Sequence, residues 1–205
     1  MTRRLIVNIV LFSLQEESLQ VLLAASSGSP SLPTGIPGEE EALEEAANHL
    51  ITTLIDRRET YLEQLYTYGE AVETLRVVYF ALVPAGACLV GSGQVRWFPV
   101  TVEAGLSGLD SEILAYALRR LRYKLEYSAV GFQLLPGEFT LSELQHTYEI
   151  ILGETLDKRN FRRRMLHSGI IEETAHQRTG EGRPARLYRY RPDAVAEVKA
   201  RRIFP

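Results

Sequence analysis

A short segment late in the chain concentrates the side chains best suited to contact an anionic polymer. It runs DKRNFRRRML, from Asp157 to Leu166. At about 100° per helical residue, Phe161 and Met165 share one face, while Arg159 and Arg163 fall on the opposite face. Arg binds phosphates or guanine edges through two parallel hydrogen bonds, and Asn does the same with adenine. The spacing therefore favours a helix that contacts nucleic acid.

The flanking residues supply the elements that such a helix needs. Thr140 opens a T-x-x-E capping box ahead of an apolar helical pattern, and Gly153 is a suitable stop. Thr155 or Asp157 then caps the basic helix. Beyond it, a glycine-rich hairpin tip within Thr179–Tyr188 lies among further arginines. A capped helix, a turn, a basic helix and a basic hairpin in this order predict a winged helix-turn-helix.

Simpler interpretations of this module remain open. A run of three arginines is by itself most often a solvated helix face, and a winged helix can serve protein contacts alone. Thr140 can act mainly as a cap, and Lys158 can lie along Phe161 with its charge in water. The candidate DNA-binding residues are Thr140, Lys158, Arg159, Asn160, Arg162, Arg163, Arg183 and Arg186.

Charge is divided unequally along the chain. From Phe139 onward there are 13 Lys and Arg against 9 Asp and Glu, a net charge of +4. Residues 1–138 hold the other 10 Lys and Arg against 17 Asp and Glu, a net charge of −7. A basic end on an acidic body favours DNA contact through that end and argues against a general nucleic-acid coat.

Several classes of protein are disfavoured by composition. The single cysteine, Cys88, excludes an internal disulfide, and its apolar neighbours predict a thiol buried in a strand. The four histidines are far apart, so no zinc site is expected. The apolar run near the N-terminus has no small-residue cleavage site, and no segment has the length of a membrane span. We therefore expect a cytoplasmic protein that does not enter a membrane.

The first part of the chain predicts a mixed sheet with few helices. Helical spacing of apolar residues predicts helices over Glu39–Leu54 and Asp110–Tyr127. The arrangement is that of an α+β domain over residues 1–128, followed by the winged module at 129–205. The expected strands are Leu5–Leu14 and Leu19–Ala25, which form a hairpin, then Tyr61–Tyr68, Leu75–Val83 and Gln94–Val102.

A second chemical motif, built on carboxylates, begins before the first helix. Gly35, five residues and then Glu41 match the opening of a Nudix box, G-x5-E-x7-R-E-U-x-E-E-x-G-U. The rest of the box is missing, since His49 stands at the Arg position and Thr53 and Leu54 at the metal-binding Glu pair. Nudix enzymes hold Mg²⁺ between those carboxylates and a pyrophosphate. We therefore predict no catalytic residues, no metal, no cofactor and no enzyme activity, with Glu41 kept as a loop cap.

The chain as a whole resembles the NrtR family of Nudix-related transcriptional regulators. The resemblance implies a Nudix-like mixed-sheet domain followed by a winged helix-turn-helix domain. It also implies a homodimer that binds palindromic double-stranded operators, represses genes of NAD biosynthesis and releases DNA on binding ADP-ribose. Some members control sugar-utilisation genes instead. The segments that carry the resemblance are YLEQLYTYG (61–69), RVVYFALVP (76–84), WFPV (97–100), LRRLRYKLEYS (118–128), FTLSELQ (139–145), LDKRNFRRRML (156–166) and GRPARLYR (182–189).

The sequence offers only a few candidate residues for the effector site of such a regulator. Arg76 can pair with a phosphate, and Tyr68, Tyr79 and Trp97 can stack on a base. Aromatic residues on strands are more often part of the core. Three alternatives to an ADP-ribose-responsive regulator stay open. The chain can be a regulator with a different effector, a scaffold protein that does not bind DNA, or a pyrophosphohydrolase that uses other carboxylates. The carboxylates left to support hydrolysis are Glu44, Glu45 and Glu70.

Overall fold

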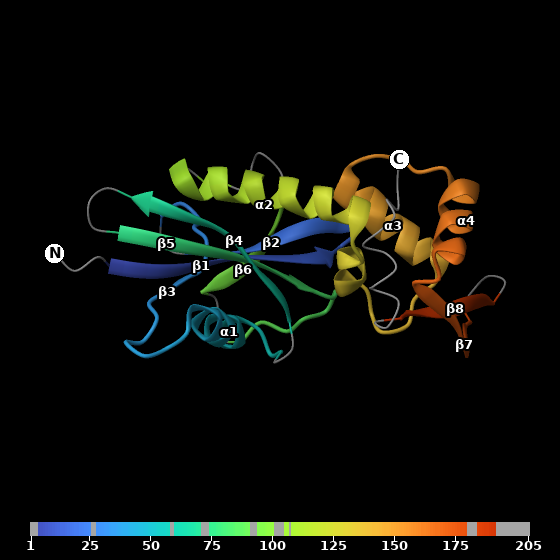
Figure 1. Ribbon diagram of the computed structural model, residues 1–205, viewed down its shortest axis with the longest axis horizontal. Coiled ribbons are helices and arrows are strands. Elements are labelled where there is room, and N and C mark those ends of the chain that lie inside the picture. The colour runs from blue at the N-terminus through green and yellow to red at the C-terminus, as the bar shows by residue number, and fades with distance from the viewer. Residues whose placement is uncertain are drawn as a thin grey trace. The chain divides into compact units, whose positions relative to one another are not determined.

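The computed structural model describes residues 4–25, 28–57, 60–70, 74–90, 94–100, 105–106, 108–179 and 184–191. The chain divides into two compact units, Met1–Leu118 and Arg119–Pro205. The division falls inside helix α2 (Gly108–Tyr127), which contributes residues to both units and is shown in Figure 1. It therefore lies earlier than the boundary expected at residue 128, and the assignment of functional domains stays a prediction. Within the described residues, no helix is long and apolar enough to cross a membrane.

The first unit is built on one mixed sheet with the strand order β4-β5-β1-β2-β6, and β3 pairs with β1. Strands β1 and β5 are parallel, and the other pairs are antiparallel. The β1–β2 turn places Glu16 and Glu17 at φ 48° and 59°, the left-handed backbone that a tight hairpin requires. The predicted hairpin and mixed sheet are confirmed. The strands are β1 Arg4–Gln15, β2 Ser18–Ala24, β3 Thr34–Gly35, β4 Tyr61–Glu70, β5 Thr74–Val83 and β6 Val95–Pro99.

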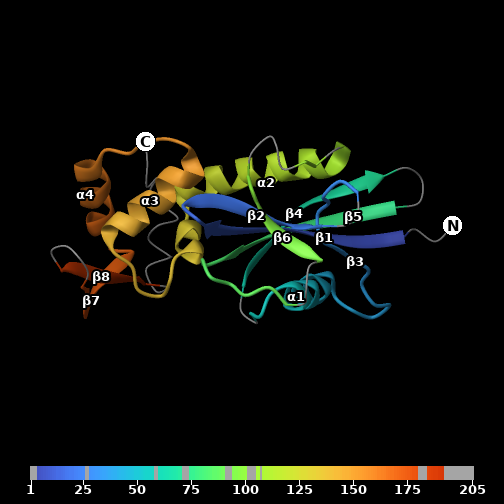
Figure 2. The same ribbon diagram turned by 180° about the vertical axis from the view of Figure 1, so that it is seen from behind.

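Helices cover both faces of this sheet, as Figures 1 and 2 show from opposite sides. Helix α1 (Leu43–Leu54) packs Ala47 and Ile51 against one face, where Val7 and Ile9 of β1 are fully buried. The first half of α2 covers the other face. Because strand side chains alternate between faces, neighbouring residues of β1 and β5 point to different helices. This alternation determines which candidate site residues lie on the same face of the sheet and can contact one ligand.

Helix α1 begins later than the sequence analysis expected. The predicted start at Glu39 is wrong, because the helix starts at Leu43 and Ala42 is its extended N-cap. A turn precedes it, in which the Glu41 carboxylate accepts a hydrogen bond of 2.9 Å from the backbone amide of Gly38. This contact closes the segment into a turn and confirms Glu41 as a loop cap.

Cys88 also departs from expectation. It was predicted in a buried strand, but it is exposed and lies outside any strand. Strand β5 ends at Val83, and the following turn places Gly86 at φ 82°. The turn carries the chain to the surface before Cys88, which explains why its apolar neighbours were misleading.

The second unit contains the second half of α2, a 3-10 helix at Val130–Leu134, helices α3 (Leu141–Leu152) and α4 (Lys158–Ser168), and a hairpin of β7 (Ile171–Arg178) and β8 (Ala185–Tyr190). The capping box at Thr140 is present, and Gly153 ends α3 at φ 76°. Asp157, and not Thr155, caps α4. Each of these local predictions is confirmed, with the second cap decided in favour of Asp157.

Candidate nucleic-acid interface and ligand site

Helix α4 presents Arg159 and Arg163 outward as its spacing predicts. Phe161 and Met165 are 2% and 0% exposed and anchor the helix in the core of the second unit. Arg159 and Arg163 are exposed on the opposite side. The amphipathic interpretation of the segment is confirmed, although contact with DNA is a further step.

Two of the predicted DNA-contacting groups on α4 are joined. The guanidinium Nη2 of Arg163 donates to the side-chain oxygen of Asn160 at 2.9 Å. The pair lies at the solvent edge of the helix, with Arg163 exposed and Asn160 half-buried. An amide and a guanidinium held together present a fixed set of donors, which suits recognition of base edges.

A hollow of about 580 Å³ lies between the start of α3, helix α4 and strand β8. Arg162 reaches across it, and its Nη2 donates to the Ser142 hydroxyl at 3.0 Å. The Nε atom of the same side chain is buried and has no hydrogen-bond partner. Ser142 was not singled out from the sequence, because its contact joins residues 20 positions apart. The residues that line the hollow are Thr140, Leu141, Ser142, Lys158, Arg162, Pro184, Ala185, Arg186 and Tyr188.

The β7–β8 hairpin is fastened to the start of α3. Phe139 and Tyr188 exchange two backbone hydrogen bonds, of 2.9 and 2.8 Å. Arg186 pairs with Glu173 across the hairpin at 2.9 Å, and both side chains are largely exposed. Exposed ion pairs of this kind are weak, so such an arginine can exchange its partner for a phosphate. The hairpin tip with the predicted DNA contact Arg183 lies outside the described residues.

The turn between α3 and α4 is set by Glu149, a residue that sequence inspection passed over. Its carboxylate accepts hydrogen bonds from the backbone amide of Leu156 at 2.8 Å and from the Gln145 side chain at 2.9 Å. The Leu156 amide, followed by Gln145, lowers the pKa of Glu149 below its ordinary value. The ionised carboxylate therefore positions the basic helix relative to α3.

We expect Glu149→Gln to lower the free energy of unfolding by about 1 kcal/mol at pH 7, because a charge-assisted acceptor becomes neutral. A carboxyl group with a depressed folded pKa stabilises above its unfolded value of about 4.3, and this contribution is lost as pH falls through the folded pKa. The difference between variant and wild type should therefore shrink at acid pH. Urea unfolding at pH 7 and pH 3.5 measures it, and a difference independent of pH would contradict the role of the charge.

The four candidate effector residues do not converge on one pocket. Tyr79 is 5% exposed and belongs, with the partly buried Trp97, to the core on the α1 face of the sheet. Burial and then the nearby Glu44 carboxylate raise the pKa of Tyr79. Tyr68 and Arg76 are register partners on β4 and β5, and they point to the α2 face. The sheet therefore separates the candidates into two pairs.

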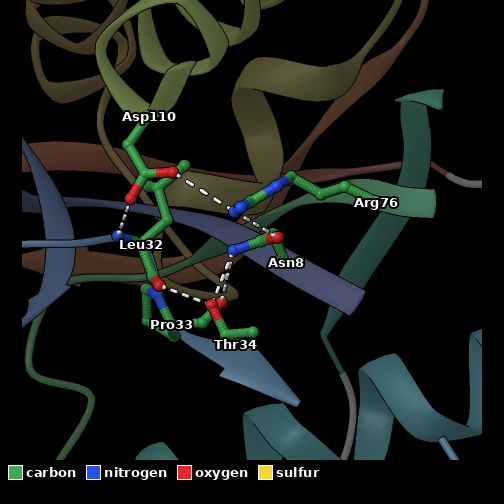
Figure 3. A network of polar contacts seen from close by, with 6 residues as sticks. All are labelled: Asn8, Leu32, Pro33, Thr34, Arg76 and Asp110. Atoms are coloured by element: carbon green, nitrogen blue, oxygen red, sulfur yellow. Dashed lines mark hydrogen bonds and ion pairs between the residues drawn. The ribbon is translucent and has the colours of Figure 1, made fainter. Parts of the chain in front are cut away.

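Arg76 takes part in a polar network at the start of α2, drawn in Figure 3. Its Nη1 donates to the side-chain oxygen of Asn8 at 2.9 Å and lies 3.4 Å from the Asp110 carboxylate. The other Asp110 oxygen accepts from the Leu32 amide at 2.9 Å, and Asn8 donates to the Thr34 hydroxyl at 2.8 Å. These contacts join β1, β5, the segment before α1 and the start of α2. They give Arg76 a structural role, and its predicted contact with a phosphate stays a prediction.

A smaller cavity of about 160 Å³ lies beside the incomplete Nudix box. Among the described residues that line it, Glu41 is the one carboxylate, and its oxygens contact the Gly38 amide at 2.9 Å and the His49 ring at 3.6 Å. Mg²⁺ prefers several oxygen ligands in octahedral geometry, so these residues do not fit the metal of a Nudix enzyme. Among the described residues, no three His, Cys, Asp or Glu side chains gather as a metal site. The lining residues are Gly35, Ile36, Glu41, Ala46, His49, Leu50 and Thr53.

Comparison with known proteins links this geometry to a family. Residues 131–190 match the model of the NrtR DNA-binding winged helix domain. A protein of Acinetobacter baylyi named ADPR responsive transcriptional repressor NtrR is 36% identical, in a match that covers 90% of this chain and 80% of that protein. These matches agree with the winged helix-turn-helix predicted from the caps and the basic helix.

Solved structures extend the likeness to the whole chain. The crystal structure of Shewanella oneidensis NrtR complexed with a 27mer DNA is 32% identical, with a TM-score of 0.84 over 97% of this chain and 96% of that chain. The NUDIX domain of the same NrtR, complexed with ADP ribose, is 27% identical, with a TM-score of 0.51 over 59% of this chain and 90% of that chain. The predicted fold class, α+β with a Nudix-like domain and a winged helix, is confirmed.

Proposed function

This chain belongs to the NrtR family, and from that premise we propose that it is a transcriptional repressor that holds operator DNA through its winged helix and releases it on binding ADP-ribose or a related nucleotide. The observation that carries the proposal is helix α4, whose buried Phe161 and Met165 leave Arg159 and Arg163 outside. The similarity to an NrtR chain complexed with DNA supports it. Operator DNA also makes the cytoplasm the expected location.

For the DNA contacts we propose α4 as the recognition helix and the β7–β8 hairpin as the wing. A single recognition helix contacts few base pairs, so two protomers bound to a palindrome, about one DNA turn apart, would supply the specificity of a repressor. Selection of duplexes from a random-sequence pool by the purified chain tests this. Recovery of a two-fold symmetric sequence, bound by two protomers, is the expected result. A pool that remains random would contradict the proposal.

For the effector we propose the α1 side of the sheet, with the cavity beside the incomplete Nudix box and the partly buried Trp97 as a stacking surface. The support is that the ADP ribose complex is formed by the corresponding domain of a relative. The cavity is smaller than the roughly 300–1,000 Å³ of ordinary ligand pockets, so the site would have to widen around the ligand. Tyr79 is too deeply buried to be included, while Tyr68 and Arg76 would serve only a ligand bound at the α2 face.

Release of DNA then needs no chemistry. An effector that binds the DNA-incompetent arrangement of the dimer more tightly than the competent one shifts the population by its differential affinity. A family member with a changed pocket can use another ligand in the same way. Because Thr53 and Leu54 replace the box carboxylates, a regulator of sugar-utilisation genes with a sugar-derived effector is the second candidate. Titration of the operator complex with phosphorylated sugars, in parallel with ADP-ribose, separates the two.

We further propose that the chain is not an enzyme. Hydrolysis of a pyrophosphate by a Nudix protein requires carboxylates that hold Mg²⁺, and Glu41 is already bonded to its own loop. We expect no Mg²⁺-dependent release of AMP from ADP-ribose above a protein-free control. Metal-dependent turnover that disappears in the double variant Glu44→Gln, Glu45→Gln would contradict this, since those exposed residues are the carboxylates that helix α1 carries within the box.

A further inference from the structure

We propose that the hollow between α3, α4 and β8 is a seat for one phosphate of the DNA backbone, and that Arg162 is a ligand of this phosphate and does not contact bases. The inference rests on the proposed function, because it concerns how the same surface holds DNA. It assigns different tasks to adjacent arginines of α4, which the sequence treats alike. It also adds Ser142 to the interface.

The position of Arg162 is the first support. Its Nη2 atom is held by the Ser142 hydroxyl at 3.0 Å, so the guanidinium is turned toward the start of α3. Its Nε atom is buried without a hydrogen-bond partner. A buried donor that lacks an acceptor is costly, and a small rotation of the guanidinium toward the adjoining hollow would let an anion there accept its hydrogen bond. A phosphate offers several acceptor oxygens to such a fork of donors.

The start of α3 supplies the second support. This helix has 12 residues, and its capping box uses the backbone amides of Thr140 and Glu143. The amides of Leu141 and Ser142, in the first turn, have no acceptor within the helix. Both residues line the hollow, so the positive end of the helix dipole faces the proposed phosphate. Uncharged amides and a guanidinium would thus bind the same anion.

The charges around the hollow agree with an anionic occupant. Lys158 lies one turn before Arg162 on α4, and Arg186 approaches from β8. The described residues that line the hollow include these three cations and no carboxylate. The nearby Glu143 is occupied by the amide of Thr140 and by Arg178, and Glu173 by Arg186. Lys158 and Arg162 therefore face no carboxylate of the described lining, and the exposed Arg186–Glu173 pair is weak enough for a phosphate to replace Glu173.

The geometry of α4 separates this phosphate seat from the surface that would contact bases. Successive residues of a helix are about 100° apart, so Arg162 and Arg163 point in different directions. Arg163 is bonded to Asn160, while Arg162 is bonded to Ser142. Phosphate contacts fix the register of a protein on the duplex, and base contacts determine its sequence preference. In this proposal Arg162 contacts a phosphate, and Arg163 contacts bases.

The decisive experiment compares Arg162→Gln with Arg163→Gln, which change the same charge on the same helix. Dissociation constants are measured for the duplex that the wild-type chain selects from a random pool and for a scrambled duplex of equal length, over a range of salt concentrations. We expect Arg162→Gln to weaken both complexes by the same factor, about tenfold, and to reduce the slope of log K against log salt by about 1 per phosphate lost. Arg163→Gln should weaken the selected duplex much more than the scrambled one.

A second variant tests whether weaker DNA binding by Arg162→Gln is caused by a disturbed fold. Ser142 is exposed in the first turn of α3, where the helix dipole favours an acidic side chain, so Ser142→Asp should not lower the thermal midpoint of unfolding while it places a carboxylate in the seat. We expect it to weaken binding of both duplexes by at least as much as Arg162→Gln. Neutral methylphosphonate substitution at single positions should identify one phosphate per half-site whose loss costs the wild-type chain affinity but costs Arg162→Gln nothing further.

The outcomes are distinct. An Arg162→Gln variant that binds both duplexes as the wild type does, or that weakens the selected duplex alone, would overturn the phosphate seat and leave the proposed function standing. If the wild-type chain selects no sequence, the proposed function fails, and the scrambled duplex still tests the seat through affinity and salt slope. If the wild-type chain binds neither duplex, both proposals fail.

Discussion

Arg163→Glu is expected to abolish sequence-specific DNA binding while the fold remains intact. Arg163 is exposed on the side of α4 opposite the buried Phe161 and Met165, and its one described side-chain bond is to Asn160. Charge reversal there removes a base contact and brings a carboxylate against the phosphates of the groove. We expect affinity for the selected duplex to fall by about 1,000-fold or more, by analogy with loss of a bidentate base contact plus repulsion.

The folding of this variant should be close to that of the wild type, because surface substitutions usually change stability by about 0.5 kcal/mol or less. Arg96→Glu is the matched control, since Arg96 is exposed on β6 in the other unit and carries the same change of charge. Fluorescence anisotropy measures the affinity of both variants for the selected duplex, and it therefore separates a local effect at α4 from the effect of the changed net charge. Equal losses in the two would show that overall charge, and not α4, governs binding.

Removal of Arg76 is expected to destabilise the first unit in the same way as removal of its partner Asp110. The two side chains are 17% and 18% exposed, and Asn8, which Arg76 also contacts, is fully buried. Loss of one member leaves the others with unpaired polar atoms in a poorly hydrated place. We expect Arg76→Met to cost about 2 kcal/mol of unfolding free energy, less than for a fully buried pair because both groups keep some access to water.

The double variant with Asp110→Asn distinguishes the two interpretations of Arg76. If the network defines its role, the effects of the single substitutions will not add, and the coupling will be about 1 kcal/mol or more. If Arg76 instead binds an effector phosphate and stabilises little, Arg76→Met will leave urea unfolding unchanged and remove only the response to the ligand. Asp110→Asn would then retain that response.

Local signals in the sequence predicted much of this molecule. The capping box at Thr140, the glycine at 153 and the spacing of Phe161 and Met165 are each confirmed, because caps and helical periodicity depend on neighbours within one or two turns. The β1–β2 hairpin follows from apolar runs separated by a short turn in the same way. These features also supply the outward-facing surface of α4.

Contacts between distant segments could not be predicted in this way. Asn8 and Arg76 are 68 positions apart, and Arg162 and Ser142 are 20 positions apart, so only the folded chain brings them together. The four effector candidates have suitable side chains for a ligand. Because side chains alternate along a strand, however, two of them lie on one face of the sheet and two on the other. The exposed position of Cys88 depends on a turn whose direction its apolar neighbours do not reveal.

The central claim is that one chain couples DNA binding to a nucleotide ligand. Its most direct test is an anisotropy titration of the purified protein on DNA from upstream of its own gene neighbourhood, repeated with saturating ADP-ribose. The account predicts specific binding that weakens at least tenfold when ADP-ribose is present, which corresponds to a coupling free energy of about 1.4 kcal/mol. Specific binding that ADP-ribose leaves unchanged would contradict the proposed effector, and failure to bind any neighbouring promoter would contradict the regulator itself.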